Sequence, residues 1–114
     1  MGKRRLLFTT MMNQEISYIP NKGYSIKKQI YDKSGLLRKE AYFNKSNIPV
    51  YRIDYGVAEI QYDYNNGNLI RERYKDTNGQ PTNRIDTGYA LVGQSFEKGK
   101  LVKKWYEGYK NQSF

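Results

Sequence analysis

Residues 35–58 read GLLRKEAYFNKSNIPVYRIDYGVA, and residues 67–90 read GNLIRERYKDTNGQPTNRIDTGYA. Aligned without a gap at an offset of 32 residues, the two segments agree at ten positions, from Gly35/Gly67 to Ala58/Ala90. A third, partial copy follows at the same offset. A fixed period of this length indicates one supersecondary unit that is stacked several times, each copy burying its apolar side against the next.

Each unit has the pattern of an antiparallel β-hairpin. Residues 58–64, AEIQYDY, alternate between apolar and polar side chains, as a half-buried strand does. Asn66-Gly67 follows, which is the strongest short hairpin signal because both central residues of the turn need a positive φ. We therefore predict an all-β fold: an antiparallel meander of about three repeated hairpins, forming an open curled sheet or a solenoid-like stack.

Two features of the hairpins follow less directly from the sequence. At the 32-residue offset, Ile26, Lys28 and Ile30 match the inward columns of 58–64, so we expect them on the same side of the sheet. The register remains open, because a two-residue and a three-residue loop place opposite faces inward.

The chain is divided into three parts by this pattern. Residues 1–25 lack most of the motif and are interpreted as an N-terminal capping strand region, with a first strand expected from Leu6 to Met12. Residues 26–110 hold the tandem 32-residue hairpins, and 111–114 form a C-terminal tail.

Composition restricts the class of protein. A chain of 114 residues fits one domain with a modest core, and its twelve Tyr, four Phe and one Trp argue for a folded, aromatic core rather than disorder. The net charge of +9 attracts polyanions, such as nucleic acid, anionic lipid or an acidic protein. The lack of Cys is compatible with a cytoplasmic location, and no apolar run reaches the length of a transmembrane segment.

Some residues carry a family resemblance. The run from Gly56-Val-Ala58 through Asn66-Gly67-Asn68 to Glu72, Tyr74 and Pro81 resembles the bacterial tandem β-hairpin repeats of the MORN-variant and YD type. The resemblance covers roughly residues 26–110. It implies an antiparallel meander that binds or scaffolds, without catalytic residues, and some such proteins are antitoxin-like or toxin-associated.

The sequence argues against an enzyme. Without His or Cys there is no imidazole base, thiol nucleophile or thiolate metal site, so we expect no catalytic residue, no metal and no cofactor. The carboxylate pairs Glu40/Glu72 and Asp54/Asp86 each recur at one period and are interpreted as structural positions seen twice. We expect Asp54 and Asp86 to accept backbone N–H groups in Asx-type turns.

Binding is the function that remains. Protein partners, particularly acidic ones, rank ahead of nucleic acid, which basic residues interleaved with aromatics would hold by charge and base stacking. Self-association through exposed strand edges is a further expectation. The candidate partner-binding residues are Tyr62, Tyr64, Arg71, Arg73, Tyr74, Lys103, Lys104, Trp105, Tyr106 and Tyr109.

Overall fold

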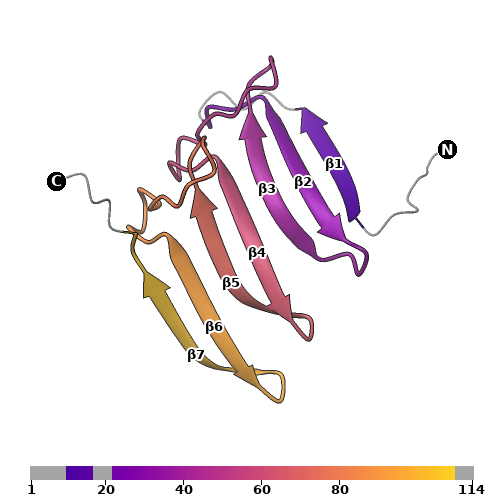
Figure 1. Ribbon diagram of the computed structural model, residues 1–114, viewed down its shortest axis with the longest axis vertical. Coiled ribbons are helices and arrows are strands. Elements are labelled where there is room, and N and C mark those ends of the chain that lie inside the picture. Colours follow the sequence, from indigo (N-terminus) through magenta and orange to yellow (C-terminus); the bar gives the residue numbers. More distant parts are fainter. Residues whose placement is uncertain (1–9, 17–21, 110–114) are drawn as a thin grey trace.

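The protein forms one antiparallel sheet whose strands follow each other in chain order (Figure 1). The computed structural model describes residues 10–16 and 22–109, and the side chains of 22–109. The strands are β1 (Thr10–Ile16), β2 (Ile26–Asp32), β3 (Leu37–Phe43), β4 (Glu59–Asn65), β5 (Asn68–Lys75), β6 (Leu91–Glu97) and β7 (Lys100–Glu107).

The predicted meander of three hairpins is confirmed. The hairpins are β2–β3, β4–β5 and β6–β7, and β1 extends the sheet beside β2. The sheet is open, with β1 and β7 at its two edges. The predicted first strand is only partly matched: β1 begins at Thr10, and residues 6–9 lie outside the described part of the chain. Among the described residues, no helix has the length and apolar character needed to cross a membrane.

Two of the three hairpins close with a two-residue turn, which settles the register that the sequence left open. Asn66 and Gly67 have φ values of 52° and 81°, and Lys98 and Gly99 have 53° and 79°. These positive values are those of a type I′ turn, whose twist matches that of the flanking strands. In the first hairpin the turn is one residue longer, and the Asp32 carboxylate accepts the N–H groups of Ser34 and Leu36 at 2.9 and 3.0 Å.

The longer first turn reverses the faces of β2. Lys27 lies opposite Tyr42 in the register, whereas the 32-residue offset would have placed Lys28 there. Because side chains alternate along a strand, one added residue moves the whole set to the other face. The prediction that Ile26, Lys28 and Ile30 share the inward columns of 58–64 is therefore wrong, and they face the opposite side.

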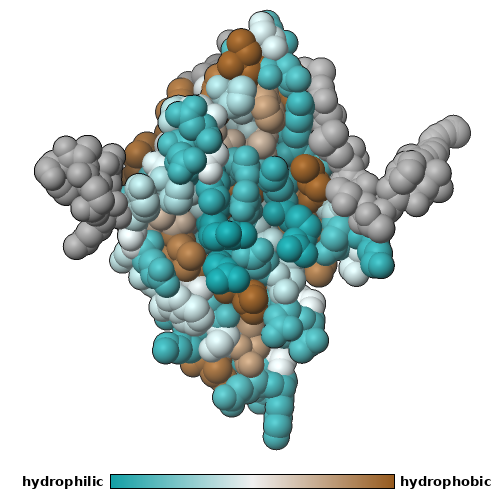
Figure 2. Space-filling model, viewed as in Figure 1, coloured by the Kyte–Doolittle hydropathy of each residue, from teal (hydrophilic) through white to brown (hydrophobic). Residues whose placement is uncertain are grey.

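The core lies on one face of the sheet, near the end where the long connections between hairpins run. Buried side chains that form it are Tyr24, Tyr42, Val57, Ile60 and Tyr74. The rings of Tyr24 and Tyr42 lie 4.9 Å apart, a distance at which tilted aromatic pairs attract each other. We call this side, which carries Tyr42, Ile60 and Tyr74, the core face, and its reverse, which carries Arg73 and Trp105, the open face. The view in Figure 2 shows a largely hydrophilic surface on which hydrophobic residues form separate patches.

The connections between hairpins bind one another through their backbones. The Ile53 N–H donates to the Lys22 carbonyl at 2.8 Å, and the Ile85 N–H donates to the Tyr55 carbonyl at 2.9 Å. Each connection is thus bonded to the one before it, so that a second row of backbone hydrogen bonds runs beside the sheet. Strands β3 and β4 are paired at only three positions, and so are β5 and β6. The row of backbone bonds between the connections therefore adds to the few strand contacts that hold neighbouring hairpins together.

Candidate functional site

The predicted binding residues do not form one cluster, because the pleat divides them between two faces. The register places Tyr62, Tyr64, Tyr74, Lys104 and Tyr106 on the core face and Arg71, Arg73, Lys103 and Trp105 on the open face. Tyr109 follows β7 and is 45% exposed. Trp105 and Tyr106 point to opposite sides, as neighbours on a strand must.

The tyrosines of the core face differ in their access to solvent. Tyr74 is only 2% exposed, so it belongs to the core and offers no contact surface. Burial, and then the charge of Glu72, raises the pKa of Tyr74 to about 12. Burial also raises the pKa of Tyr62. Tyr106, in contrast, is 48% exposed. Of these three tyrosines, Tyr106 is the one that a partner can reach readily.

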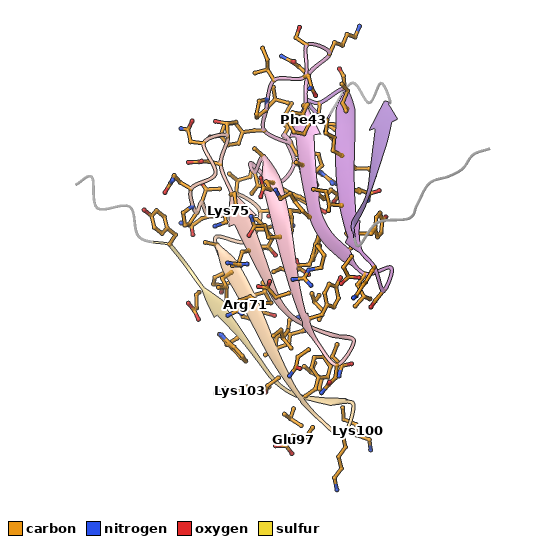
Figure 3. All side chains as sticks on the ribbon, turned by 45° about the vertical axis from the view of Figure 1, so that its right-hand side comes forward. Phe43, Arg71, Lys75, Glu97, Lys100 and Lys103 are labelled. Atoms are coloured by element: carbon orange, nitrogen blue, oxygen red, sulfur yellow. The ribbon has the colours of Figure 1, made fainter. Side chains whose placement is uncertain are left out.

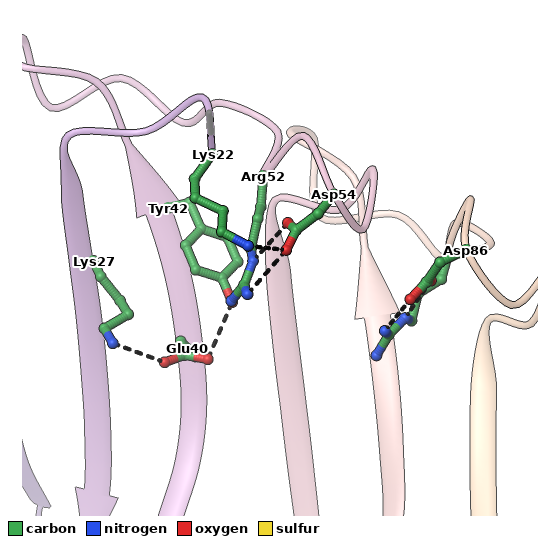
Figure 4. A network of polar contacts seen from close by, with 8 residues as sticks. Lys22, Lys27, Glu40, Tyr42, Arg52, Asp54 and Asp86 are labelled. Atoms are coloured by element: carbon green, nitrogen blue, oxygen red, sulfur yellow. Dashed lines mark hydrogen bonds and ion pairs between the residues drawn. The ribbon is translucent and has the colours of Figure 1, made fainter. Parts of the chain in front are cut away.

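A polar network stabilises the core face at the level of the connections (Figure 4). Arg52 binds both oxygens of Asp54 at 2.8 and 3.1 Å, and Lys22 adds an ion pair to the same carboxylate at 2.6 Å. The Arg52 guanidinium, together with Lys22, lowers the pKa of Asp54 to about 2. The Tyr42 hydroxyl accepts a hydrogen bond from Arg52 and donates one to Glu40.

This network corrects the predicted role of the two aspartates. The chief partner of Asp54 is the Arg52 side chain. Asp86 likewise binds the Arg84 guanidinium at 2.8 Å, and the expected backbone N–H groups, those of Asp86 and Thr87, contribute less to holding its carboxylate. An arginine two residues before each aspartate competes successfully for the carboxylate, since a charge-assisted bidentate pair is stronger than a bond to a neutral amide. Asx-type turns do occur, but at Asp32, Asn44 and Asp76.

Tyr55 is a residue whose importance the sequence did not reveal. The Arg52 guanidinium lies 4.0 Å from its ring centroid and the Arg84 guanidinium lies 3.8 Å from it. Both distances are within the range of a cation–π contact. Tyr55 therefore joins two successive connections. The two arginines could have been found from the sequence, because Arg-Ile-Asp occurs at 52–54 and again at 84–86. Tyr55 could not, because Thr87 stands at the equivalent position.

The open face carries a half-buried indole with cations around it. The Trp105 indole packs closely on Gly93 and leaves no room there for a Cβ. Lys103 is 5.7 Å from the Trp105 ring centroid. Arg71 and Arg73 share the Asp63 carboxylate at 3.0 and 3.1 Å, so part of their charge is neutralised. Figure 3 shows Arg71, Lys75 and Lys103 along the second and third hairpins.

A groove of about 710 Å³ opens where the second and third hairpins diverge. It is mostly polar, with Asn65, Asn68, Lys98 and Trp105 among its lining residues. The Gln94 amide spans the divergence and donates to the Leu69 carbonyl at 2.8 Å, replacing a bond between the strands. No group of three or more metal-binding side chains lies within the described part of the chain.

The outer edge of the third hairpin is the most exposed part of the sheet. All residues of β7 except Trp105 are exposed, and Leu101 and Val102 are 51% and 53% exposed. No carboxylate of the described residues lies within ion-pair distance of Lys103 or Lys104. This edge combines apolar surface with unpaired positive charge.

Comparisons with protein-family models, with curated proteins and with solved structures find no match to this chain.

Proposed function

We propose that the protein is a non-catalytic module that binds another protein, as a scaffold or an antitoxin-like component of an assembly. The observation that carries this proposal is the exposed edge of the sheet, where β7 has a paired strand on one side only among the described residues. The resemblance to MORN-variant and YD-type hairpin repeats, which bind rather than catalyse, supports the same function.

The chemistry of β7 fits a protein partner. Leu101, Val102 and Tyr106 are each about half exposed, and their removal from water would stabilise a complex. Lys103 and Lys104, on opposite faces of the strand, would attract an acidic partner. An exposed strand of this kind is also a template for pairing with a further strand.

The test is a pull-down from native extract at moderate salt, with and without nuclease. We expect a protein partner that survives nuclease treatment. A Lys103→Glu/Lys104→Glu variant should slow association with that partner more than it speeds dissociation, because surface charge acts chiefly on the on-rate. Lys33→Glu/Lys45→Glu, with the same change of charge at exposed sites far from β7, is the control. An unchanged on-rate for the first variant would remove β7 from the interface.

Nucleic acid is a second candidate, favoured by the indole and cations of the open face. Trp105, Lys103 and Arg71 lie on that face, and an aromatic ring among cations can hold a single strand by stacking. Trp105 is the sole Trp, so titration with a single-stranded oligonucleotide should quench its fluorescence. Binding should weaken steeply as salt rises, since counterions are released. Recovery of nothing but nuclease-sensitive material would place this candidate first.

A further inference from the structure

The edge of the sheet at β7 lacks the cover that the same position receives in the other two hairpins. Tyr42, Tyr74 and Tyr106 stand 32 residues apart, at the same place in β3, β5 and β7. Tyr42 and Tyr74 are 0% and 2% exposed, because the next hairpin and its connection cover them, whereas Tyr106 is 48% exposed.

In the first two hairpins, the segment that covers this tyrosine also accepts a hydrogen bond from its backbone N–H. The Tyr42 N–H donates to the Ala58 carbonyl at 3.1 Å, and the Tyr74 N–H donates to the Ala90 carbonyl at 3.0 Å. Both acceptors immediately precede the next strand. The corresponding N–H of Tyr106 points to the outer edge, where no described strand follows. It is a donor placed for the carbonyl of an added chain.

A second open position lies beside the first. Ile53 packs against Gly23, where an added Cβ would be 2.6 Å from the Ile53 side chain, and Ile85 packs against Gly56 at the same distance. The corresponding Gly88 has φ of +81°, and beyond its chain neighbours no atom of the described residues lies within 4 Å of an added Cβ. The connection between the second and third hairpins therefore presents a glycine, Gly88, against which no isoleucine of the described residues packs.

The charge of the missing cover follows from the boundary between the first two hairpins. Lys39 of β3 forms an ion pair with Glu59 of β4 at 3.7 Å, and Arg38 reaches Asp63 of β4 at 3.8 Å. Lys103 occupies in β7 the place of Lys39 in β3. An acidic side chain on an added strand could form with Lys103 an ion pair equivalent to the one between Glu59 and Lys39.

A second copy of the chain fits this edge poorly. Two antiparallel copies of β7 related by a two-fold axis at Lys103 or Lys104 would set that lysine opposite its own copy, and like charges directly opposite each other are destabilising. The occupant must bring negative charge of its own.

We propose that the β7 edge binds an extended acidic segment of a partner protein, which adds to the sheet as an antiparallel strand. The segment places a carboxylate near Lys103 and an aliphatic residue on Gly88. Ile53 precedes Glu59, the first residue of β4, by six residues, and Ile85 precedes Leu91 of β6 by the same number. In the partner segment, the aliphatic residue should therefore lie six residues before the first residue that pairs with β7 as a strand. This proposal rests on the proposed function and names the partner's chemistry.

The probe is a synthetic peptide with the sequence of residues 53–65, IDYGVAEIQYDYN, which has this arrangement and three carboxylates. It is titrated into the full chain labelled with ¹⁵N, and amide hydrogen exchange is followed residue by residue. We expect binding to slow exchange of the Tyr106 N–H by about tenfold or more, because a new strand bond protects it. A control peptide with Lys in place of both carboxylates of the strand should bind about tenfold more weakly, as like charges then meet.

Two variants of the protein give the reciprocal readout. Lys103→Glu should prefer the lysine peptide to the acidic one, which a structural defect would not produce. Gly88→Ala should weaken the parent peptide several-fold but leave unchanged the affinity of a peptide in which Ile53 is replaced by glycine. Circular dichroism and the exchange pattern of β4–β5 show that each variant keeps its fold.

The proposal is wrong if the peptide does not bind at millimolar concentration, or if it binds without protecting the Tyr106 N–H. Equal affinity for the acidic and lysine peptides would also overturn it. Protection of β3 in place of β7 would indicate that the peptide exchanges with β4, and would overturn it as well. A β7-dependent dimer of the protein alone in sedimentation would assign the edge to a second copy. The proposed function fails separately, if no protein partner survives nuclease in the pull-down. A captured partner that Lys103→Glu/Lys104→Glu binds normally would leave that function standing and refute this proposal.

Discussion

The packing of one connection against the next can be measured by adding a single methyl group. Gly56 and Gly88 occupy the same place in successive connections, with φ of +70° and +81°. Alanine at either site is held in the left-handed region, at a cost of about 1 kcal/mol. At Gly56 its Cβ would also lie 2.6 Å from Ile85 Cγ2, whereas at Gly88 it would meet no other described residue within 4 Å.

The extra cost at Gly56 comes from moving Ile85. The three closest atoms belong to the branched part of that side chain, which is near the backbone and yields little. Overpacking of a tight contact costs about 1–3 kcal/mol, and the 70% exposure of Ile85 places this case near the lower end. We expect Gly56→Ala to lower the free energy of unfolding by about 1–2 kcal/mol more than Gly88→Ala does.

The assay is urea unfolding followed by the fluorescence of Trp105. With a denaturant slope of about 1.5–2 kcal/mol per molar, the midpoint for Gly56→Ala should lie about 0.5–1.3 M below that for Gly88→Ala. Adding Ile85→Ala to Gly56→Ala removes the obstacle and should restore about 1 kcal/mol as a coupling energy. Equal midpoints for the two glycine variants, or no coupling to Ile85, would refute the view that the connections stabilise each other by this contact.

Three further outcomes are expected. Replacing Gly93 by Ala should lift Trp105 off the strand, shift its emission to the red and lower the free energy of unfolding by about 1–3 kcal/mol, measured in the same urea titration. Because the pKa of Asp54 is lowered to about 2 in the folded protein, its contribution to stability is complete above about pH 4 and is lost as the pH falls toward 2. That loss should be about 1 kcal/mol after allowance for solvent screening, and Asp54→Asn should abolish it in unfolding curves taken across this range. Tyr74→Ala should cost about 3–5 kcal/mol in thermal or urea unfolding, whereas Tyr106→Ala should cost less than about 1 kcal/mol, because the same position is buried in one hairpin and exposed in the other.

The hairpins could be read from the sequence because their signals are local. Asn66-Gly67 fixes its turn through the backbone angles that these two residues accept, and the alternation from Ala58 to Tyr64 marks one face of a strand without reference to any neighbour.

The candidate surface was harder to predict, because facing and exposure depend on distant residues. Trp105, Arg71 and Tyr74 were all predicted as binding residues, but Trp105 and Arg71 lie on the open face, whereas Tyr74 is buried in the core. The position shared by Tyr42, Tyr74 and Tyr106 is buried only where another hairpin follows. The residues of the strand itself do not show whether one follows.

The sequence alone determined the class of fold and the number of hairpins, since strand alternation, turn chemistry and the 32-residue period are properties of the chain read in order. Only the tertiary structure decided which face each strand presents and which edge remains uncovered. One additional residue in the turn after Asp32 reverses β2, and the exposure of Tyr106 follows from the absence of a described strand beyond β7. Both depend on pairing between strands, and pairing is a contact across space that a period along the chain does not specify.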